Sequence, residues 1–599
     1  MKKKSKKWII ITSVIIILII IGYFFRWDFY FYFTSKGINK KGGDITIINA
    51  RIWTGDSVDK WKTSMAIKDG IIISMDDNSP SGKVIDAKGK LIVPGMWDAH
   101  THPHSPYILT SPEAPTLFGA KTLDEVLNRV KNYIKEHPED KFPRFFGWFS
   151  HIFKDGQKPT RQILDSIVSD RPVYLVKHNG HAHWCNTKAL EIAGALEKDP
   201  PEFRGEGKIE RDSVTGLATG YLEETEYGAT HGLMLNVFKR VKPYTFEEQV
   251  IIQQLILEEY PKLGVTSIWA KDGDIDITRV YEKILRNNSL PVRANLDNLF
   301  TYYSELSDLK KFYDRGVEVK NSDLPKDFLR TNIVKLYIDL PIEGWMWMFE
   351  PYSDGSGDAG KPSYNMDYFR KQVEISDSLG LQINVSIYGD RALNECMNIM
   401  EEIIMKNPDK ERRHTFEHSE FIIKSDLPRF KKLGIIASMN PIVSYPDKTF
   451  QEHMLNKFGI ERLDEVFNPY KDLLDNGAIV VSGSDFPLAP MDPLIGIHIL
   501  VNGTDFEGYK GLWRLKLLSV EEALKTYTVY PAYASWMENK IGKLKPGFYG
   551  DFVMLSDDIL SDNFPKEKLY KVKAILTVLN GHIVHEDFSN TEKIIDFNK

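Results

Sequence analysis

Eight short apolar runs, separated by helical stretches, constrain the fold of this chain more than any other feature of its sequence. Alternation of short β-branched runs with helical stretches is typical of βα units and a parallel sheet. We expect strands at residues 91–102, 266–270, 292–296, 333–339, 382–387, 413–418, 435–440 and 478–485. Eight such units predict an α/β fold with a TIM-like (β/α)8 barrel, whose chemistry lies at the carboxyl ends of its strands.

The segments before and after this region have a different sequence pattern. Residues 44–92 and 542–586 consist of short β-rich runs between Gly, Asp and Asn turns. We expect them to form one composite β-sandwich, with two unrelated β modules as the alternative. The barrel domain then covers residues 93–541. Its first two strands are much further apart than one crossover requires, which predicts an insertion over the barrel mouth at about residues 104–250.

The N-terminus carries a membrane signal. A basic tail at residues 1–7 precedes an almost continuously apolar segment at residues 8–25. About 20 apolar residues span a bilayer core, and lysines before such a segment favour a cytoplasmic N-terminus. We therefore expect a single-pass transmembrane helix at 8–25, a linker at 26–43, and a catalytic domain outside the cytoplasm at the cell membrane. A cleaved signal peptide is the alternative.

The composition excludes several classes of function. The 77 basic and 83 acidic residues give a net charge of -6, and no basic face is visible beyond the first seven residues, which argues against a nucleic-acid partner. The two cysteines, Cys185 and Cys396, cannot build a disulfide framework or a four-cysteine zinc site. A metal would need histidine, carboxylate or lysine-derived ligands. We expect a small-molecule substrate, and the sequence leaves the oligomeric state open, a homo-oligomer included.

The end of the first expected strand gives the strongest local signal for a metal site. Side chains alternate along a strand, so Asp98, His100 and His102 share one face. Two imidazoles on one face can bind one divalent ion. Two ordinary polar residues at a strand end are the alternative, because a lone His-x-His motif is a weak signal.

The fourth expected strand carries a lysine on its inward face. Lys335, Tyr337 and Asp339 alternate with apolar residues, so they point toward the barrel axis. A buried lysine is costly unless it is paired or modified. A neutral amine can react with carbon dioxide to form a carbamate, which is an oxygen ligand for a metal. A salt bridge from Lys335 to Asp339 or Asp485 is the alternative.

The sixth and eighth expected strands end in two further candidate ligands. His418 offers an imidazole, and Asp485 offers a carboxylate that can bind a metal and accept a proton from water. Each of them alone is more often a satisfied buried polar group. Their convergence with the first and fourth strands predicts a metal centre in the barrel.

With these motifs the sequence resembles the amidohydrolase superfamily, in particular amidohydrolase family 3 and its YtcJ-like and N-substituted formamide deformylase-like branch. The resemblance covers residues 44–586. It rests on the motifs at residues 93–102, 180–186, 220–224, 334–335, 389–392, 417–418 and 483–485, and on the closing segment at 541–551. It implies a metal-dependent hydrolase, with zinc as the expected metal, that acts on carbon–nitrogen bonds other than peptide bonds.

The resemblance also implies roles for individual residues. One metal position would use His100, His102, Lys335 and Asp485, and a second would include His418. Asp485 would take a proton from water and pass it to the departing amine. Either the metal or His181 would polarise the scissile carbonyl, and Glu224 would compete as a ligand if Lys335 is unmodified.

The sequence departs from the family pattern at two positions. Ser386 stands where the family usually carries a fifth-strand histidine, and Val443 stands where many relatives place another histidine. A hydroxyl is a poor zinc ligand, so one ion is expected rather than two. The same substitutions leave two alternatives to a hydrolase: a catalytically impaired, surface-tethered binding protein and a mononuclear deaminase.

Four residues are candidates for a substrate pocket. Trp148 and Trp184 lie in the expected insertion, and Tyr337 and Ser386 lie in barrel strands. Aromatic side chains would suit an apolar acyl group. Packing in the core is the alternative interpretation for the two tryptophans.

Overall fold

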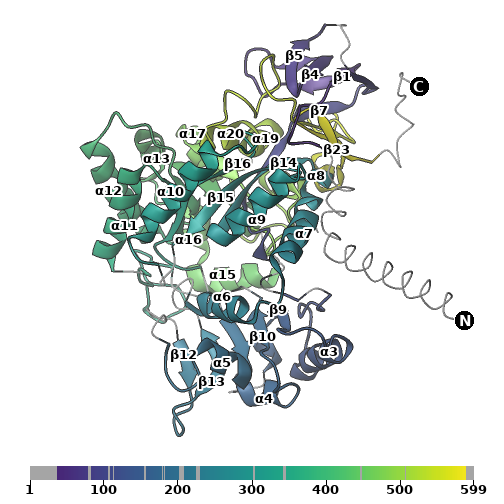
Figure 1. Cartoon of the computed structure of the whole chain (residues 1–599). Helices are drawn as coiled ribbons and strands as arrows, with labels where there is room; N and C mark the ends of the chain where they lie inside the picture. Colours follow the sequence, from purple (N-terminus) through teal and green to yellow (C-terminus); the bar gives the residue numbers. More distant parts are fainter. Residues whose placement is uncertain are drawn as a thin grey trace, which may run out of the picture.

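The computed structural model consists of a central barrel with a further layer at each end (Figure 1). The layer built from both ends of the chain lies at the top of the view, and the insertion lies at the bottom. The structure describes residues 37–77, 82–105, 108, 110–111, 113–153, 157–178, 180, 182–200, 208–223, 229–300, 304–341, 346–363, 365–444, 448–505 and 508–587.

The barrel is built from eight parallel strands that neighbour one another in chain order. They are β8 (Met96–Thr101), β14 (Val265–Gly273), β15 (Arg293–Leu299), β16 (Leu329–Tyr337), β17 (Gln382–Ile387), β18 (Thr415–His418), β19 (Ile436–Met439) and β20 (Ile479–Ser482). Each expected strand overlaps one of them, so the TIM-like (β/α)8 prediction is confirmed.

Backbone hydrogen bonds just beyond β20 close the barrel against β8. The Asp485 amide donates to the His100 carbonyl at 2.7 Å, and the His102 amide donates to the Phe486 carbonyl at 2.7 Å. Gly483 permits this close approach, because a Cβ there would lie 2.2 Å from the backbone nitrogen of His100. The closure therefore brings the first and last strands of the barrel together at their carboxyl ends.

Helices accompany the barrel strands, and most of them lie on the outer side of the barrel (Figure 1). They are α7 (Phe246–Leu257), α8 (Glu259–Lys262), α9 (Ile275–Arg286), α10 (Asp308–Asn321), α11 (Met366–Leu379), α12 (Asp390–Lys406), α13 (Leu427–Leu433), α14 (Pro441–Ser444), α15 (Lys448–Phe458), α16 (Ile460–Val466), α17 (Tyr470–Asp475), α18 (Pro493–Asn502), α19 (Val520–Tyr527) and α20 (Val529–Ala534).

Helix α9 illustrates why these segments are helical. Asp274 caps its first turn by accepting a hydrogen bond from the Ile277 amide at 2.8 Å. One face is buried at the spacing of an amphipathic helix, with Ile277, Val280, Tyr281, Ile284 and Leu285. Lys283 and Arg286 lie in the last turn, where positive charge is favourable.

Two sheets at the top of the view share one hydrophobic core. The first contains β1 (Ile45–Ile48), β4 (Met65–Lys68), β5 (Ile71–Met75) and β6 (Lys83–Asp86). The second contains β2 (Arg51–Trp53), β3 (Trp61–Lys62), β7 (Leu91–Pro94), β21 (Phe552–Leu555), β22 (Ala574–Leu579) and β23 (His582–Glu586), and the short helix η2 (Lys566–Lys571) precedes β22. Strand β7 pairs with β21 in antiparallel fashion, with Ile92 opposite Met554, so the two ends of the chain meet in one sheet.

The first expected strand, 91–102, is divided between two sheets. Residues up to Pro94 belong to β7, and β8 begins at Met96. Gly95 lies at the junction, where a Cβ would lie 2.1 Å from the Thr266 hydroxyl oxygen. The glycine therefore lets the chain pass from the outer sheet directly into the barrel.

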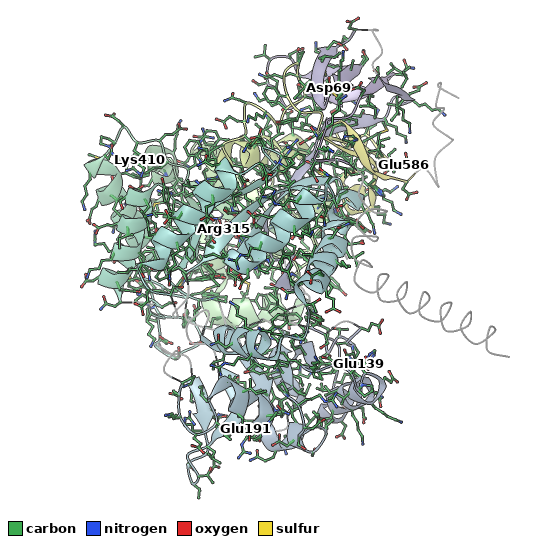
Figure 2. The ribbon with its side chains drawn as sticks, viewed as in Figure 1. Asp69, Glu139, Glu191, Arg315, Lys410 and Glu586 are labelled. Carbon is green, nitrogen blue, oxygen red and sulfur yellow. The ribbon has the colours of Figure 1, made fainter. Side chains whose placement is uncertain are left out.

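The insertion follows β8 and forms its own five-stranded sheet. The strands are β9 (Arg144–Trp148), β10 (Tyr174–Lys177), β11 (Ala182–Cys185), β12 (Lys208–Arg211) and β13 (Ala218–Glu223), and the helices are α3 (Leu123–Glu136), η1 (Ser150–Ile152), α4 (Arg161–Asp165), α5 (Thr187–Ala193) and α6 (Ala229–Val241). Charged side chains such as Asp69 on the upper layer and Glu191 on the insertion lie on the outer surface (Figure 2).

A helix with the length and apolar character of a membrane span is not found among the described residues. The expected anchor at 8–25 and the basic tail lie outside them. The last part of the expected linker is packed rather than free. The Asn39 side chain donates to the Leu290 carbonyl at 3.0 Å and accepts from the Leu290 amide at 2.9 Å, which ties the chain to the barrel.

Candidate metal centre

Two histidines and a carboxylate converge where the first and last barrel strands meet. The Nε2 atoms of His100 and His102 lie 3.4 and 3.1 Å from Oδ1 of Asp485. Within the described chain, one ligand atom from each residue forms a group whose members all lie within 4.8 Å of one another. The structure therefore brings together three of the residues that the sequence singled out.

A carboxylate orients each of the two imidazoles. Nδ1 of His100 lies 2.5 Å from Oε2 of Glu417, and Nδ1 of His102 lies 3.1 Å from Oδ2 of Asp272. An ionised carboxylate only accepts hydrogen bonds, so each Nδ1 must carry the proton. Both Nε2 lone pairs are then directed toward the centre, as in carboxylate–histidine–metal arrangements.

Three further side chains contact the carboxylate of Glu417. The Thr415 hydroxyl donates to it at 2.5 Å, the Ser438 hydroxyl at 2.8 Å, and Nζ of Lys271 lies 3.2 Å away. Burial alone would raise the pKa of Glu417, but the charge of Lys271 and the hydrogen bond from His100 hold it well below its usual value. Glu417 is therefore ionised and can fix the His100 ring.

Lys335 lies in the same network through a partner that the sequence did not suggest. Its Nζ lies 3.2 Å from Oδ1 of Asp272, and the Tyr337 hydroxyl donates to the same oxygen at 2.8 Å. The Lys335 side chain is almost fully buried. An ion pair is thus present, but with Asp272 rather than with Asp339 or Asp485.

Asp339 has a different role from the one expected of it. Its carboxylate accepts hydrogen bonds from the backbone amides of Trp347, Tyr388 and Gly389, at 2.9, 2.9 and 2.8 Å. It lies beyond the end of β16, where it joins the loops after β16 and β17. The prediction that Asp339 faces the barrel axis beside Lys335 is wrong, because the alternation of the strand ends at Tyr337.

His418 lies beside the centre without belonging to the three-residue group. Its ring centroid is 4.7 Å from that of His100, and it stacks on Tyr388 at 4.5 Å. Burial and the neighbouring His100 hold the pKa of His418 well below its usual value, so the ring is neutral, the form that binds a metal. His418 and Asp485 both have left-handed backbone conformations, with φ of 64° and 61°, which are uncommon outside glycine and cluster at functional sites.

The donor set fits a divalent cation. His100 is fully buried, and its Nε2 has no hydrogen-bond partner among the described residues. Two imidazole nitrogens and one carboxylate oxygen match zinc ligation with an open position. Burial lowers the pKa of His102, but Asp272 and Asp485 outweigh it and raise that pKa to about 9, so a cation at Nε2 competes with a proton.

The remaining predicted residues are distributed over the molecule. Ser386 is buried in β17, opposite Tyr337 on one side and Glu417 on the other. Trp148 and Trp184 are buried together in the insertion, and their indole nitrogens donate to the Leu175 and Thr160 carbonyls at 3.0 and 2.8 Å. Their role in a substrate pocket stays a prediction. Val443 is half-buried in α14, and His181 and Glu224 lie outside the described residues.

Sequence reasoning missed the ligand-orienting residues Asp272 and Glu417 and the charged neighbour Lys271. Lys271 and Asp272 directly follow the expected second strand, 266–270, so their signal was a polar pair at a strand end. Glu417 precedes His418 in the motif at residues 417–418. Its position at the end of the sixth strand was the available signal.

Comparisons with known proteins identify the family of this chain. The model for amidohydrolase family 3, described as "Amidohydrolase family", matches residues 83–585. The chain is 25% identical over 520 residues to the putative amidohydrolase YtcJ of Bacillus subtilis, with 85% of this chain and 91% of the relative covered. It is 23% identical over 572 residues to N-substituted formamide deformylase of Arthrobacter pascens, with 91% and 98% covered. A crystal structure of an uncharacterized metal-dependent hydrolase from Pyrococcus horikoshii matches the fold with a TM-score of 0.67 at 23% identity, covering 88% of this chain and 99% of that one.

Proposed function

Because this chain belongs to amidohydrolase family 3, we propose that it is a metal-dependent hydrolase that cleaves a carbon–nitrogen bond in a small, non-peptide amide or formamide. One observation carries this proposal: the Nε2 atoms of His100 and His102 and the carboxylate of Asp485 converge on one point, and each Nδ1 is held by a carboxylate.

The proposed ligands are His100, His102 and Asp485, for one ion, with zinc as the metal that suits this donor set. When bound, such a cation lowers the pKa of water from about 15.7 toward 7 and polarises a carbonyl. His418 and Lys335 are proposed as further ligands, Lys335 only as a carbamate. The ion pair with Asp272 favours its unmodified, charged form.

Asp485 is proposed as the residue that moves the proton. Burial raises its pKa, but the neighbouring imidazoles of His100 and His102 outweigh it and hold that pKa well below its usual value, so the carboxylate is ionised at neutral pH. An ionised carboxylate at this position can accept a proton from the attacking water and return it to the leaving amine. His181 and Glu224 keep their proposed roles as carbonyl-polarising residue and competing ligand.

The substrate class is supported by the relative of known activity. N-substituted formamide deformylase matches nearly the whole chain, so N-substituted formamides are the first substrates to test, followed by small amides and cyclic carbon–nitrogen substrates. Deamination at the same centre is the competing reaction, because a fold does not fix the reaction.

The experiment that tests the proposal uses the full-length chain purified in detergent. We expect about one zinc per chain by elemental analysis, and amine release from at least one N-substituted formamide. His100→Ala and Asp485→Asn should abolish both metal retention and turnover. His453→Ala removes an exposed imidazole on α15 and should change neither. A chain that retains no zinc after reconstitution, and releases no amine from any member of the panel, would instead support the binding-protein alternative.

We also propose that residues 8–25 anchor the chain in the membrane, with the N-terminus cytoplasmic and the barrel outside. The support is the apolar segment itself and the lysines before it. The full-length chain should remain in the membrane pellet after alkaline carbonate extraction. Protease added to intact cells should digest the barrel domain. Release of the full-length chain by carbonate would contradict the anchor.

A further inference from the structure

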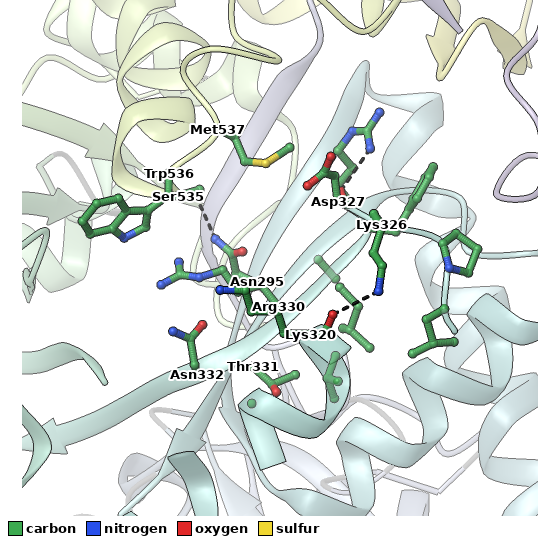
Figure 3. A pocket seen from close by; sticks show the side chains of 18 of the residues that line it. Asn295, Lys320, Lys326, Asp327, Arg330, Thr331, Asn332, Ser535, Trp536 and Met537 are labelled. Atoms are coloured by element: carbon green, nitrogen blue, oxygen red, sulfur yellow. Dashed lines mark hydrogen bonds between the residues drawn. The ribbon is translucent and has the colours of Figure 1, made fainter. Parts of the chain in front are cut away.

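A cavity of about 690 Å³ opens at the end of the barrel opposite the metal centre. It lies at the amino ends of β15 and β16, whereas His100 and Asp485 lie at carboxyl ends. The last turn of α10, the loop at 322–328 and the segment at 535–541 complete its walls (Figure 3). Its volume lies within the range of 300–1,000 Å³ that is typical of small-molecule sites.

The cavity contains the half-buried side chain of Arg330, which has no ion-pair partner among the described residues. Nη1 of Arg330 is buried and has no hydrogen-bond partner among the described residues. The charge of Asp297 acts on the guanidinium without a hydrogen bond to it, and Arg413 adds a like charge. Both oxygens of Asp297 are already occupied, by the Trp269 indole at 2.5 Å and the Asn384 amide at 2.7 Å.

Arg293, in the wall of the same cavity, has a carboxylate counter-ion. It pairs with Asp551 through two nitrogens, at 2.6 and 3.2 Å, and donates to the Asp327 carbonyl at 3.0 Å. An uncompensated buried charge costs several kcal/mol or more, so buried charges in proteins are normally paired. Burial lowers the pKa of Arg330 to about 10, so the group is still charged at neutral pH.

The other polar groups of the cavity add positive charge and hydrogen-bonding capacity. Lys320, at the end of α10, and Lys326 line the cavity, and the fully buried Thr331 hydroxyl has no partner among the described residues. The carboxylate of the wall, Asp327, is already engaged by Nζ of Lys540 at 2.7 Å and by a tyrosine hydroxyl. The cavity therefore presents a net positive surface to whatever enters it.

The opposite wall is partly apolar. Trp536 and Met537 lie across the cavity from Lys320 and Thr331 (Figure 3). The Trp536 side chain is 40% exposed, although the guanidinium of Arg413 covers one face of its ring at 4.0 Å. A ligand of mixed character would thus meet charged donors on one side and an indole on the other.

We propose that this cavity binds a small organic anion, a carboxylate or phosphate joined to an apolar body, with Arg330 as its counter-ion. The planar guanidinium matches the geometry of both oxyanions, and Lys320 adds a second charge. The apolar body lies against Trp536. This site is separate from the metal centre, and the proposal does not depend on the hydrolase activity.

Calorimetric titration of the full-length chain at low ionic strength tests the proposal. The probes are phenyl phosphate, benzoate, inorganic phosphate and the neutral benzyl alcohol. We expect saturable binding of phenyl phosphate or benzoate, and the tighter of the two identifies phosphate or carboxylate as the preferred group. Inorganic phosphate and benzyl alcohol should each bind at least tenfold more weakly than the better organic anion. Inorganic phosphate lacks the apolar body, and benzyl alcohol lacks the anionic group.

Variants separate this site from nonspecific anion binding. Arg330→Met should weaken the better anion at least tenfold, and Lys320→Met, at an exposed helix end that tolerates change, should weaken it severalfold. Arg279→Met removes an exposed arginine of α9 and should have no effect. The proposal is overturned if neither organic anion binds, if benzyl alcohol or inorganic phosphate binds as tightly as the better anion, or if Lys320→Met and Arg330→Met both bind like the unmodified chain.

Discussion

Nδ1 of His100 lies 2.5 Å from Oε2 of Glu417, and this contact decides which nitrogen of His100 faces the metal centre. Both side chains are fully buried, so water cannot replace either partner. Glu417 in turn is fixed by Lys271, Thr415 and Ser438. A chain of buried contacts thus extends from β14, β18 and β19 to one ligand atom.

Replacing Glu417 should weaken the centre without removing a ligand. In Glu417→Gln the amide can present its NH2 group to Nδ1, which would move the ring proton to Nε2. Changes of this kind typically cost 10–100-fold in metal affinity. Competition with a calibrated zinc chelator measures the change. Glu401→Gln, at a surface ion pair with Arg429 and Lys432, is the matched control, and equal affinities for the two variants would argue against the orienting role.

The state of Lys335 can be read from the response to bicarbonate. Because its Nζ is held in an ion pair with Asp272, we expect the amine not to react with carbon dioxide. Zinc loading of the purified chain should then be the same in bicarbonate-free and bicarbonate-containing buffer. Loading that rises with bicarbonate, and loses this dependence in Lys335→Met, would show that the lysine is a carbamate ligand.

Gly483→Ala should disturb both stability and metal binding. The new Cβ would meet the His100 backbone 2.2 Å away, so the end of β20 must move from β8. Overpacking of this kind costs about 1–3 kcal/mol, and the displacement of Asp485 should also lower zinc retention. Urea unfolding and elemental analysis measure the two effects.

Gly380→Ala is the control for Gly483→Ala. Gly380 has a φ of 85° at the end of α11 and open space around it, so its substitution should cost about 1 kcal/mol and leave zinc content unchanged. Equal zinc loss in both variants would show that Gly483 has no special role in closing the barrel.

Acid should destabilise the chain through Asp377, which lies far from the metal centre in α11. Burial raises the pKa of Asp377, but hydrogen bonds from His414 and Arg412 outweigh it and hold that pKa below its usual value. A lowered folded-state pKa stabilises the fold above the unfolded value of about 3.9, and the contribution is lost as the pH falls below it.

Asp377→Asn tests this contribution. It leaves Arg412 buried without its partner, so we expect a loss of about 3–5 kcal/mol at pH 7 and a flatter dependence of stability on pH below about 4. Urea unfolding at a series of pH values measures both. A variant whose stability falls with acid as steeply as that of the unmodified chain would exclude Asp377 as the responsible group.

The sequence predicted the architecture well because the barrel strands are short, apolar and bounded by turns. Each expected run overlaps a barrel strand. Alternation along one strand predicted His100 and His102, and the end of an apolar run predicted Asp485. His100 and His102 both reach the centre, although the pairing of β8 with β14 shifts between Ile268 and Ala270.

The same rule failed where strands are irregular. The pairing of β14 with β15 shifts between Ala270 and Gly273, so the adjacent Lys271 and Asp272 both reach the centre. Glu417 and His418 are also adjacent, and the left-handed conformation of His418 turns its ring beside that of His100. Irregularities of this kind depend on tertiary packing, so periodicity in one sequence cannot reveal them.

The pairing of β7 with β21 has a consequence for biosynthesis. Nearly the whole polypeptide must leave the ribosome before Ile92 can pair with Met554. Until then β7 is an unprotected strand edge, and such edges promote aggregation. A chain released early, through a premature stop or a frameshift, would therefore keep this edge exposed and become a substrate for chaperones and proteases.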